Sequence, residues 1–214
     1  DLINCGGDLE YAKRAPIHER IPFFESSPGP DIPEMESPRV IKSHLPYQLV
    51  PQSFWEQNCK VIYMARNAKD TMVSYYHFDR IQMYQPDPGS WPQYMEKFLT
   101  GQVTWGSWWD HVIGWWKNKD KHRILYLFFE DMKENPRREV LKIMDFIGMN
   151  LSNEIVDRIT EHTSFRVMKD NPMANYTCTI FIDNNHFTVA QNEEFDTFHQ
   201  NQMVGTLIPF RFVL

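Results

Sequence analysis

Lys42 and His44 are the first residues of this chain whose types and spacing suit chemistry. They stand two residues apart, just before Leu45-Pro46, and on a short strand that spacing puts both side chains on one face. A neighbouring cation favours neutral imidazole, which can take a proton, and a lysine can stabilise negative charge. The pair therefore predicts acid–base chemistry on an anionic group. The alternative is an exposed strand end that carries two polar residues.

Arg66 and Ser74 form a second pair. Arg66 directly follows the apolar segment 60–65, and Ser74 lies within the helix-like segment behind it. Ligands of open parallel sheets bind at the carboxyl ends of the strands, and a helix N-terminus attracts anions. This arrangement predicts an anion site. The alternative is a surface ion pair between Arg66 and Asp70, which would stabilise the fold little.

The elements that must position these residues alternate between strand and helix. Strands are expected where apolar residues run between turn signals, over 39–46, 60–65 and 124–131. Helices are expected where apolar residues recur at three- and four-residue steps, over 69–84, over 91–118, from 136 and from 153. In the second of these helices the tryptophans form a stripe that is typical of a face packed on a sheet.

Strand and helix signals together predict the α/β class. The segment 60–65 is apolar without clean alternation, which indicates a strand buried on both faces in a parallel sheet. Asn135 and Ser152 are expected to cap helices, and Glu130-Asp131 is expected to cap the turn before Asn135. The segment 26–38 holds four prolines, which predicts a surface loop.

Composition excludes several classes of function. The net charge of −6 and a pI near 5.7 argue against a nucleic-acid partner. The three cysteines, at positions 5, 59 and 178, are widely spaced, which favours a reducing, cytoplasmic location. No apolar run approaches the roughly 20 residues that cross a membrane, so no membrane partner is expected. The histidines lack metal-ligand spacing, so no metal is expected.

The length of 214 residues predicts one domain, 1–214. The chain opens at Asp1 without a methionine, so we expect this domain to be incomplete at its N-terminus.

Six segments taken together closely resemble the cytosolic sulfotransferases of the phenol/aryl type. They lie in that family's order over nearly the whole chain, and they read IKSHLP, YMARNAKDTMVSYYHF, GSWWDHVIGWWK, LFFEDMKENPRRE, HTSFRVMKDNPM and FTVAQNEEFD. The resemblance implies a parallel-sheet, three-layer α/β fold related to P-loop nucleotide kinases. It also implies 3′-phosphoadenosine-5′-phosphosulfate (PAPS) as sulfuryl donor, with PAP as its product. The acceptor would be the hydroxyl of a small phenolic or steroid-like molecule, as in xenobiotic and hormone metabolism.

The resemblance also assigns roles to individual positions. It makes His44 the catalytic base that takes the acceptor proton, and Lys42 the contact to the transferring group. Arg66 and Ser74 match the pair that holds the 3′-phosphate of the cofactor. The remaining matches lie around the nucleotide, at Thr163, Ser164, Phe165 and Phe129, and in the acceptor pocket, at Phe23 and Phe78. Phe165 matches an aromatic residue that packs on adenine, and Phe129 stands where the family usually has tyrosine.

Several features of the family pattern are missing. The phosphosulfate-binding loop would precede Asp1, and CTIFIDN replaces the R-K-G-x-x-G-D-W-K stretch before HFTVAQ. Asn184 replaces the lysine of the family's dimer motif, which puts a homodimer through 184–193 in question. We expect a chain complete as written to transfer no sulfate. The alternative reading is accordingly a truncated, catalytically inactive protein that binds small molecules on the same fold.

Overall fold

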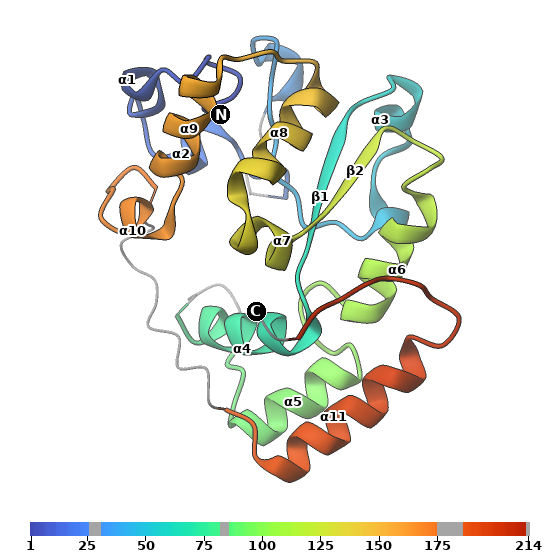
Figure 1. Cartoon of the computed structure of the whole chain (residues 1–214). Coiled ribbons are helices and arrows are strands. Elements are labelled where there is room, and N and C mark those ends of the chain that lie inside the picture. The colour runs from blue at the N-terminus through green and yellow to red at the C-terminus, as the bar shows by residue number, and fades with distance from the viewer. Residues whose placement is uncertain (26–30, 82–85, 175–185, 213–214) are drawn as a thin grey trace. The chain divides into compact units, whose positions relative to one another are not determined.

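The computed structural model describes residues 1–25, 31–81, 86–174 and 186–212 of the chain (Figure 1). The chain divides into two compact units. The first unit consists of Asp1–His44 with Asn135–Thr177, and the second of Leu45–Glu134 with Cys178–Leu214. Among the described residues, no helix is both long enough and apolar enough to cross a membrane.

A two-stranded parallel sheet lies in the second unit. Its strands are β1 (Val61–Ala65) and β2 (Ile124–Phe128), and they pair in register along their whole length (Figure 1). The predicted strand over 60–65 is therefore confirmed. Because the strands are parallel, their carboxyl ends meet at one edge. Arg66 and Phe129, which follow these ends, consequently emerge side by side.

The exposure of β1 differs from what its sequence predicts. Ile62 and Met64 are about two-fifths exposed, at 43% and 42%, whereas Ala65 is buried. Successive strand residues point to opposite faces, so the alternation shows one packed face and one open face within the described residues. The expectation of a strand buried on both faces is wrong for β1.

The helices of the second unit supply most of its core. The long ones are α4 (Ala68–Ile81), α5 (Trp91–Leu99), α6 (Trp108–Asn118) and α11 (Val189–Gln202). The short ones are η2 (Tyr47–Leu49), α3 (Gln52–Glu56) and α7 (Phe129–Glu134). Their buried core residues include Met72, Tyr76, Tyr94, Phe98, Trp108, Trp109, Val112 and Phe195. Trp108 and Trp109 of the predicted stripe pack in this helical core, whereas Trp115 and Trp116 contact Tyr63 and Tyr126 of the sheet.

The single helix predicted over 91–118 is two helices, α5 and α6. Gly101 and Gly106 lie between them with φ of +74° and +75°, a conformation that glycine adopts without the steric cost of a side chain. A Cβ on Gly101 would lie 3.0 Å from the backbone nitrogen of Ser107. Ser107 then caps α6 by accepting the Asp110 N–H. The apolar spacing continues through this segment, but the two glycines and the new cap end one helix and begin another.

The strand predicted over 124–131 ends at Phe128, because the chain turns directly into α7. Two acidic residues occupy the first turn of this helix, Glu130 and Asp131, where the helix dipole favours negative charge. The helix predicted over 69–84 is α4, which ends at Ile81; residues 82–85 lie outside the described part.

The first unit contains only helices and loops among its described residues. Its elements are α1 (Leu9–Ala12), α2 (Ile17–Arg20), η1 (Ile32–Glu34), α8 (Pro136–Ile147), α9 (Asn153–His162) and α10 (Phe165–Met168). The predicted caps are confirmed: Asn135 accepts the Arg138 N–H before α8, and Ser152 accepts the Ile155 N–H before α9. Of the loop predicted over 26–38, residues 31–38 are described and contain the single turn η1.

The core of the first unit joins α8 and α9 to the N-terminal segment. Val140, Met144, Val156 and Ile159 are its buried residues. Gly7 packs against this core with a φ of +77°, and a Cβ there would lie 2.6 Å from the Cγ2 of Ile155.

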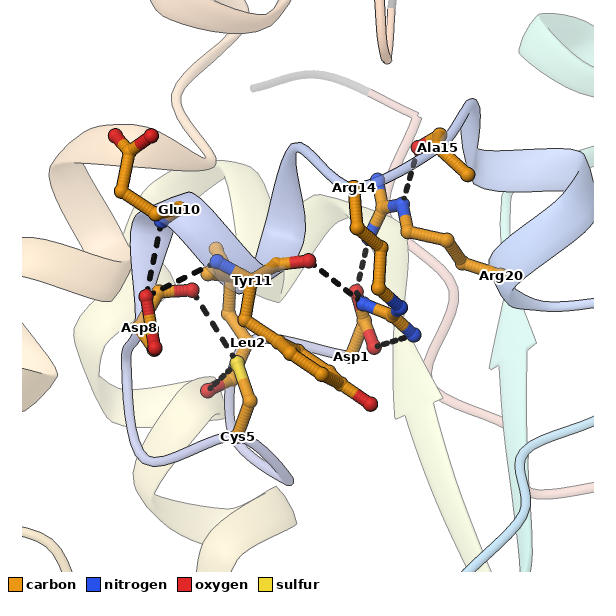
Figure 2. Close-up of polar contacts among 9 residues, drawn as sticks. All are labelled: Asp1, Leu2, Cys5, Asp8, Glu10, Tyr11, Arg14, Ala15 and Arg20. Atoms are coloured by element: carbon orange, nitrogen blue, oxygen red, sulfur yellow. Dashed lines mark hydrogen bonds and ion pairs between the residues drawn. The ribbon is translucent and has the colours of Figure 1, made fainter. Parts of the chain in front are cut away.

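Polar contacts hold the N-terminal segment together (Figure 2). The Asp1 carboxylate pairs with Arg20, and Arg14 lies 3.4 Å from the same carboxylate. Asp8 caps α1 by accepting the N–H groups of Glu10 and Tyr11, both at 3.0 Å. These contacts stabilise the segment that leads to the loop carrying Phe23.

Candidate active site

The segment that carries Lys42 and His44 lies in the first unit and is not a strand. The prediction of a strand over 39–46 is wrong: among the described residues, this segment forms an isolated parallel bridge from Lys42 to Phe23 and no ladder. Two residues after Lys42, the His44 N–H donates to the carboxylate of Glu25 instead of to a backbone carbonyl. The strand ladder therefore stops after one bridge.

Glu25 fixes the backbone around the histidine. Its Oε1 accepts the Ser43 hydroxyl at 2.6 Å and the His44 N–H at 2.8 Å. Its Oε2 is buried and has no hydrogen-bond partner among the described residues. A buried carboxylate is costly unless it is hydrogen-bonded, so the two accepted bonds determine how this side chain and the 43–44 backbone sit together.

Phe23, Lys42 and His44 form one cluster in the first unit. The rings of Phe23 and His44 meet edge to face with centroids 4.9 Å apart, and the Lys42 ammonium lies 5.7 Å from the Phe23 centroid. Desolvation lowers the pKa of Lys42, and the negative charge of Glu25 offsets part of that effect. The cluster therefore combines a cation, an imidazole and an aromatic surface, of which Lys42 and His44 are exposed.

Arg66 lies at the carboxyl end of β1 in the second unit. Its guanidinium stacks over the Phe129 ring, 4.6 Å from the centroid. Its Nη2 lies 3.6 Å from the Oδ2 of Asp70, so the ion pair considered as an alternative does form. Its Nε is buried and has no hydrogen-bond partner among the described residues. Because a guanidinium carries five donors, Arg66 keeps capacity for an anion beside this ion pair.

Ser74 and Phe78 lie on the helix that follows Arg66. Both belong to α4, and Ser74 is one turn beyond Asp70. Residues four apart share a helix face, so Ser74 and Phe78 continue the face that begins with the Arg66–Asp70 pair. Phe78 is 39% exposed. The second unit thus brings Arg66 and Phe129 into contact and places Ser74 and Phe78 on the adjoining helix.

The segment 163–165 links α9 to α10 in the first unit. The Thr163 hydroxyl donates to the Ile159 carbonyl at 2.8 Å, and Ser164 caps α10 by accepting the Val167 N–H. A hydroxyl that accepts a bond still has its own proton to donate. Phe165 is 75% exposed, so its ring offers a free face for stacking.

Two carboxylates of these sites could not be assigned from the sequence. Glu25 belongs to no sequence motif, because its role depends on how the chain folds back to bring residues 43–44 beside it. The prediction that Glu130-Asp131 caps the turn before Asn135 is wrong. Glu130 is buried and accepts hydrogen bonds from Asn67, and Asp131 pairs with Arg211 at 2.6 Å. Only the apolar residues around Glu130 hinted at its burial.

Comparisons with known proteins identify the family of this chain. The family model of the sulfotransferase domain matches residues 1–206. Sulfotransferase 1B1 of Canis lupus familiaris is 48% identical over 235 residues, covering 99% of this chain and 79% of the relative. Human sulfotransferase 1C2 is 48% identical over 233 residues, covering 98% and 79%. The aligned span of 235 residues is 21 longer than the whole chain, so the dog enzyme holds residues within that span that this chain lacks.

Solved structures give the same result for the fold. The crystal structure of mouse sulfotransferase SULT7A1 complexed with PAP has a TM-score of 0.76 at 29% identity, covering 94% of this chain and 81% of the mouse chain. Retinol dehydratase in complex with androsterone and PAP has a TM-score of 0.87 at 21% identity, covering 99% and 77%. The latter likeness shows the fold, and the predicted α/β class is confirmed.

The parallel α/β core is the fold of the enzyme class to which the family match assigns this chain. The match over residues 1–206 and the identities of 48% make the class specific. This chain belongs to the sulfotransferase family, whose members are enzymes that transfer sulfuryl groups.

Proposed function

We propose that this protein transfers a sulfuryl group from PAPS to the hydroxyl of a small phenolic or steroid-like acceptor. The observation that carries the proposal is the Phe23–Lys42–His44 cluster in a chain of the sulfotransferase family. The mouse relative was solved with PAP, which supports the same donor here. That residues 1–214 act as one sulfotransferase domain remains part of the proposal, as does a cytoplasmic location.

His44 is the catalytic base of this reaction. It is exposed, its backbone is held by Glu25, and a neutral imidazole can accept the proton of the acceptor hydroxyl as the oxygen attacks sulfur. Lys42 stabilises the negative charge that develops on the transferring group. When bound, PAPS supplies an activated sulfuryl group with PAP as the leaving group. The work of the protein is mainly positioning and charge stabilisation.

The residues that would hold the nucleotide have the chemistry this role requires. The buried, unpartnered Nε of Arg66 and its neighbouring guanidinium donors suit the 3′-phosphate, and Ser74 adds a hydroxyl on the following helix. Phe165, exposed at the start of α10, suits stacking on adenine. Each unit therefore offers groups of the kind that a nucleotide with an extra phosphate needs.

Three further nucleotide contacts are proposed. Thr163 and Ser164 present hydroxyls next to Phe165 in the first unit. Phe129 stacks on the Arg66 guanidinium, although it lacks the hydroxyl that a tyrosine would add there.

Phe23 and Phe78 are the proposed walls for the acceptor. Phe23 contacts the His44 ring edge to face, so an aromatic acceptor beside Phe23 would lie next to the base. Phe78 is exposed on α4. Flat aromatic faces of this kind suit phenols and steroid-like rings.

A homodimer through 184–193 remains a prediction. Asn184 lies outside the described residues, whereas Val189 at the start of α11 is 78% exposed, as a residue of an interface would be in one subunit. Sedimentation of the purified protein at two concentrations would measure whether it forms a dimer.

One assay tests the proposed function. The protein is incubated with radiolabelled PAPS and 4-nitrophenol, and PAP binding is measured by calorimetry in parallel. We expect transfer by the unaltered protein when a phosphosulfate-binding loop precedes Asp1, and none by residues 1–214 without one. For His44→Ala we expect loss of at least about 100-fold in kcat, with PAP affinity unchanged. PAP binding without any transfer would support the alternative, an inactive binding protein. Neither binding nor transfer would overturn the proposal.

A further inference from the structure

Glu130 is a buried carboxylate at the start of α7. It is 1% exposed, and its Oε1 accepts two hydrogen bonds from Asn67, one from the backbone N–H at 2.8 Å and one from the side-chain amide at 2.9 Å. Asn67 is itself 2% exposed. Burying such polar groups is costly unless they are paired. The contact therefore fixes the ends of β1 and β2 to each other through side-chain chemistry as well as through the strand ladder.

The side chain of Asn67 is held at both of its ends. Its amide nitrogen donates to Glu130, and its Oδ1 accepts the Asp70 N–H at 2.9 Å in the first turn of α4. The amide thus has one orientation that satisfies both partners. Glu130 thereby determines how Asn67 meets the N-terminal turn of α4.

The peptide group between Arg66 and Asn67 is held on both sides. Its carbonyl accepts the Trp108 indole N–H and the Thr71 hydroxyl, each at 3.2 Å. Its N–H donates to Glu130. A peptide group is planar, so bonds at both ends of this plane restrict ψ of Arg66 and, with it, the direction of the Arg66 side chain.

The guanidinium of Arg66 is positioned by the neighbour of Glu130. It stacks over Phe129 at 4.6 Å. Residues 129 and 130 therefore hold Arg66 twice, once at the end of its side chain and once at the peptide that follows it. Neither of these contacts uses the buried Nε, which has no hydrogen-bond partner in the described part of the chain.

We propose that Glu130 is a positioning residue for the anion site. It locks the Arg66–Asn67 peptide and the first turn of α4 before any ligand binds, so that Arg66 presents its free donors in one direction. This inference rests on the proposed function, in which Arg66 holds the 3′-phosphate of the nucleotide. Pre-organisation of this kind raises affinity because less freedom is lost on binding.

The contact predicts that geometry matters and that charge does not. Both accepted bonds end on Oε1, and Oε2 has no partner among the described residues. A glutamine keeps an acceptor oxygen at the place of Oε1. Glu130→Gln should therefore preserve the function that Glu130→Ala removes. Asp131→Ala is the matched control, because it removes the adjacent carboxylate of the same helix, which pairs with Arg211.

The test measures PAP affinity by calorimetry for the unaltered protein and these three variants. We expect affinity to fall about tenfold in Glu130→Ala, the effect of losing hydrogen bonds at a buried site, and to stay within about threefold in the other two. Affinity in Glu130→Ala equal to that of the unaltered protein would overturn the role of Glu130 alone. An equal loss in Glu130→Gln would also overturn it, because the charge would then be the cause.

A second measurement needs no variant. Amide exchange followed by NMR in the nucleotide-free protein should show the Asn67 N–H protected as strongly as the β1–β2 ladder. Fast exchange at Asn67 would overturn the pre-organised peptide even if Glu130→Ala fails to fold. Absence of PAP binding by the unaltered protein would overturn the proposed function. It would also overturn the proposal that the orientation of Arg66 serves phosphate binding.

Discussion

The carboxylate of Glu25 holds the backbone of His44, with Oε1 2.8 Å from the histidine nitrogen. The same oxygen accepts the Ser43 hydroxyl, so one side chain from a neighbouring loop fixes two successive residues. The backbone N–H of the proposed base is therefore held by a side-chain carboxylate, where its sequence suggests a strand ladder. The contact joins a partly buried carboxylate to the backbone of the residue whose exposed imidazole would take the proton.

Removal of the Glu25 carboxylate should slow catalysis. We expect Glu25→Ala to lower kcat about tenfold or more, because a small misplacement of a catalytic group is costly. Glu25→Gln should retain most of the rate at neutral pH, since its amide oxygen can accept both bonds. Steady-state sulfation of 4-nitrophenol measures this, with Glu19→Ala, an exposed residue of α2, as control. An alanine variant as fast as the unaltered protein would contradict it.

The charge of Glu25 should also affect the pH profile through Lys42. Desolvation lowers the pKa of Lys42, and Glu25 partly opposes this by raising it. Without that negative charge the lysine loses its proton at a lower pH. If transfer requires the charged lysine, the alkaline limb of kcat against pH should move to lower pH in Glu25→Gln. A profile that superimposes on that of the unaltered protein would show that Lys42 does not act as a cation in the reaction.

Much of this architecture was predictable from local sequence, and the exceptions share a cause. Strand β1, helix α4 and the caps Asn135 and Ser152 depend on residues close in the chain, and all four were predicted correctly. The sequence motifs also indicated the family. Two features were not predicted: that residues 39–46 form no strand, and which residues Glu25 and Glu130 contact. Both depend on contacts between residues far apart in sequence. One such contact, from Glu130 to Asn67, spans 63 residues, and periodicity carries no information about it.

The ion pair between Arg66 and Asp70 should compete with the nucleotide. Its two side chains are 28% and 42% exposed and lie 3.6 Å apart, so it stabilises the fold by at most about 1 kcal/mol. Asp70→Asn should raise PAP affinity a few-fold, because Arg66 loses its competing anion. Arg66→Ala should lower it about tenfold or more, since charge-assisted bonds to phosphate are lost. Calorimetry with PAP measures both effects.

The alternative role of Arg66, a surface ion pair with Asp70 alone, predicts no effect on PAP binding. If Arg66 served only that pair, both variants would leave PAP affinity unchanged. Asp70 also lies in the first turn of α4, so Asp70→Asn should cost about 0.3–1 kcal/mol in stability through the helix dipole. Thermal unfolding of the nucleotide-free variant separates this effect from binding.

Asp79 should make the protein less stable as the pH rises from about 4 to about 6. This residue of α4 is 8% exposed; burial raises its pKa to about 6, although the Tyr94 hydroxyl bond and the charge of Lys97 oppose the rise. Between the unfolded and the folded pKa, the native state keeps a proton that the unfolded chain has released. Stability is therefore greatest below the unfolded value and falls through this window, by about 3 kcal/mol for the full shift, of which about 2 kcal/mol is lost between pH 4 and 7.5.

Asp79→Asn removes this dependence while its amide oxygen still accepts the Tyr94 hydroxyl. Urea unfolding followed by tryptophan fluorescence at four pH values between 4 and 7.5 should show the free energy of unfolding of the variant falling less across the window, by about 2 kcal/mol. Asp110→Asn, an exposed position on α6, should leave the slope as it is in the unaltered protein. Equal slopes in all three proteins would mean that Asp79 is ionised in the native state at pH 4, and that its burial against Tyr94 does not control its proton.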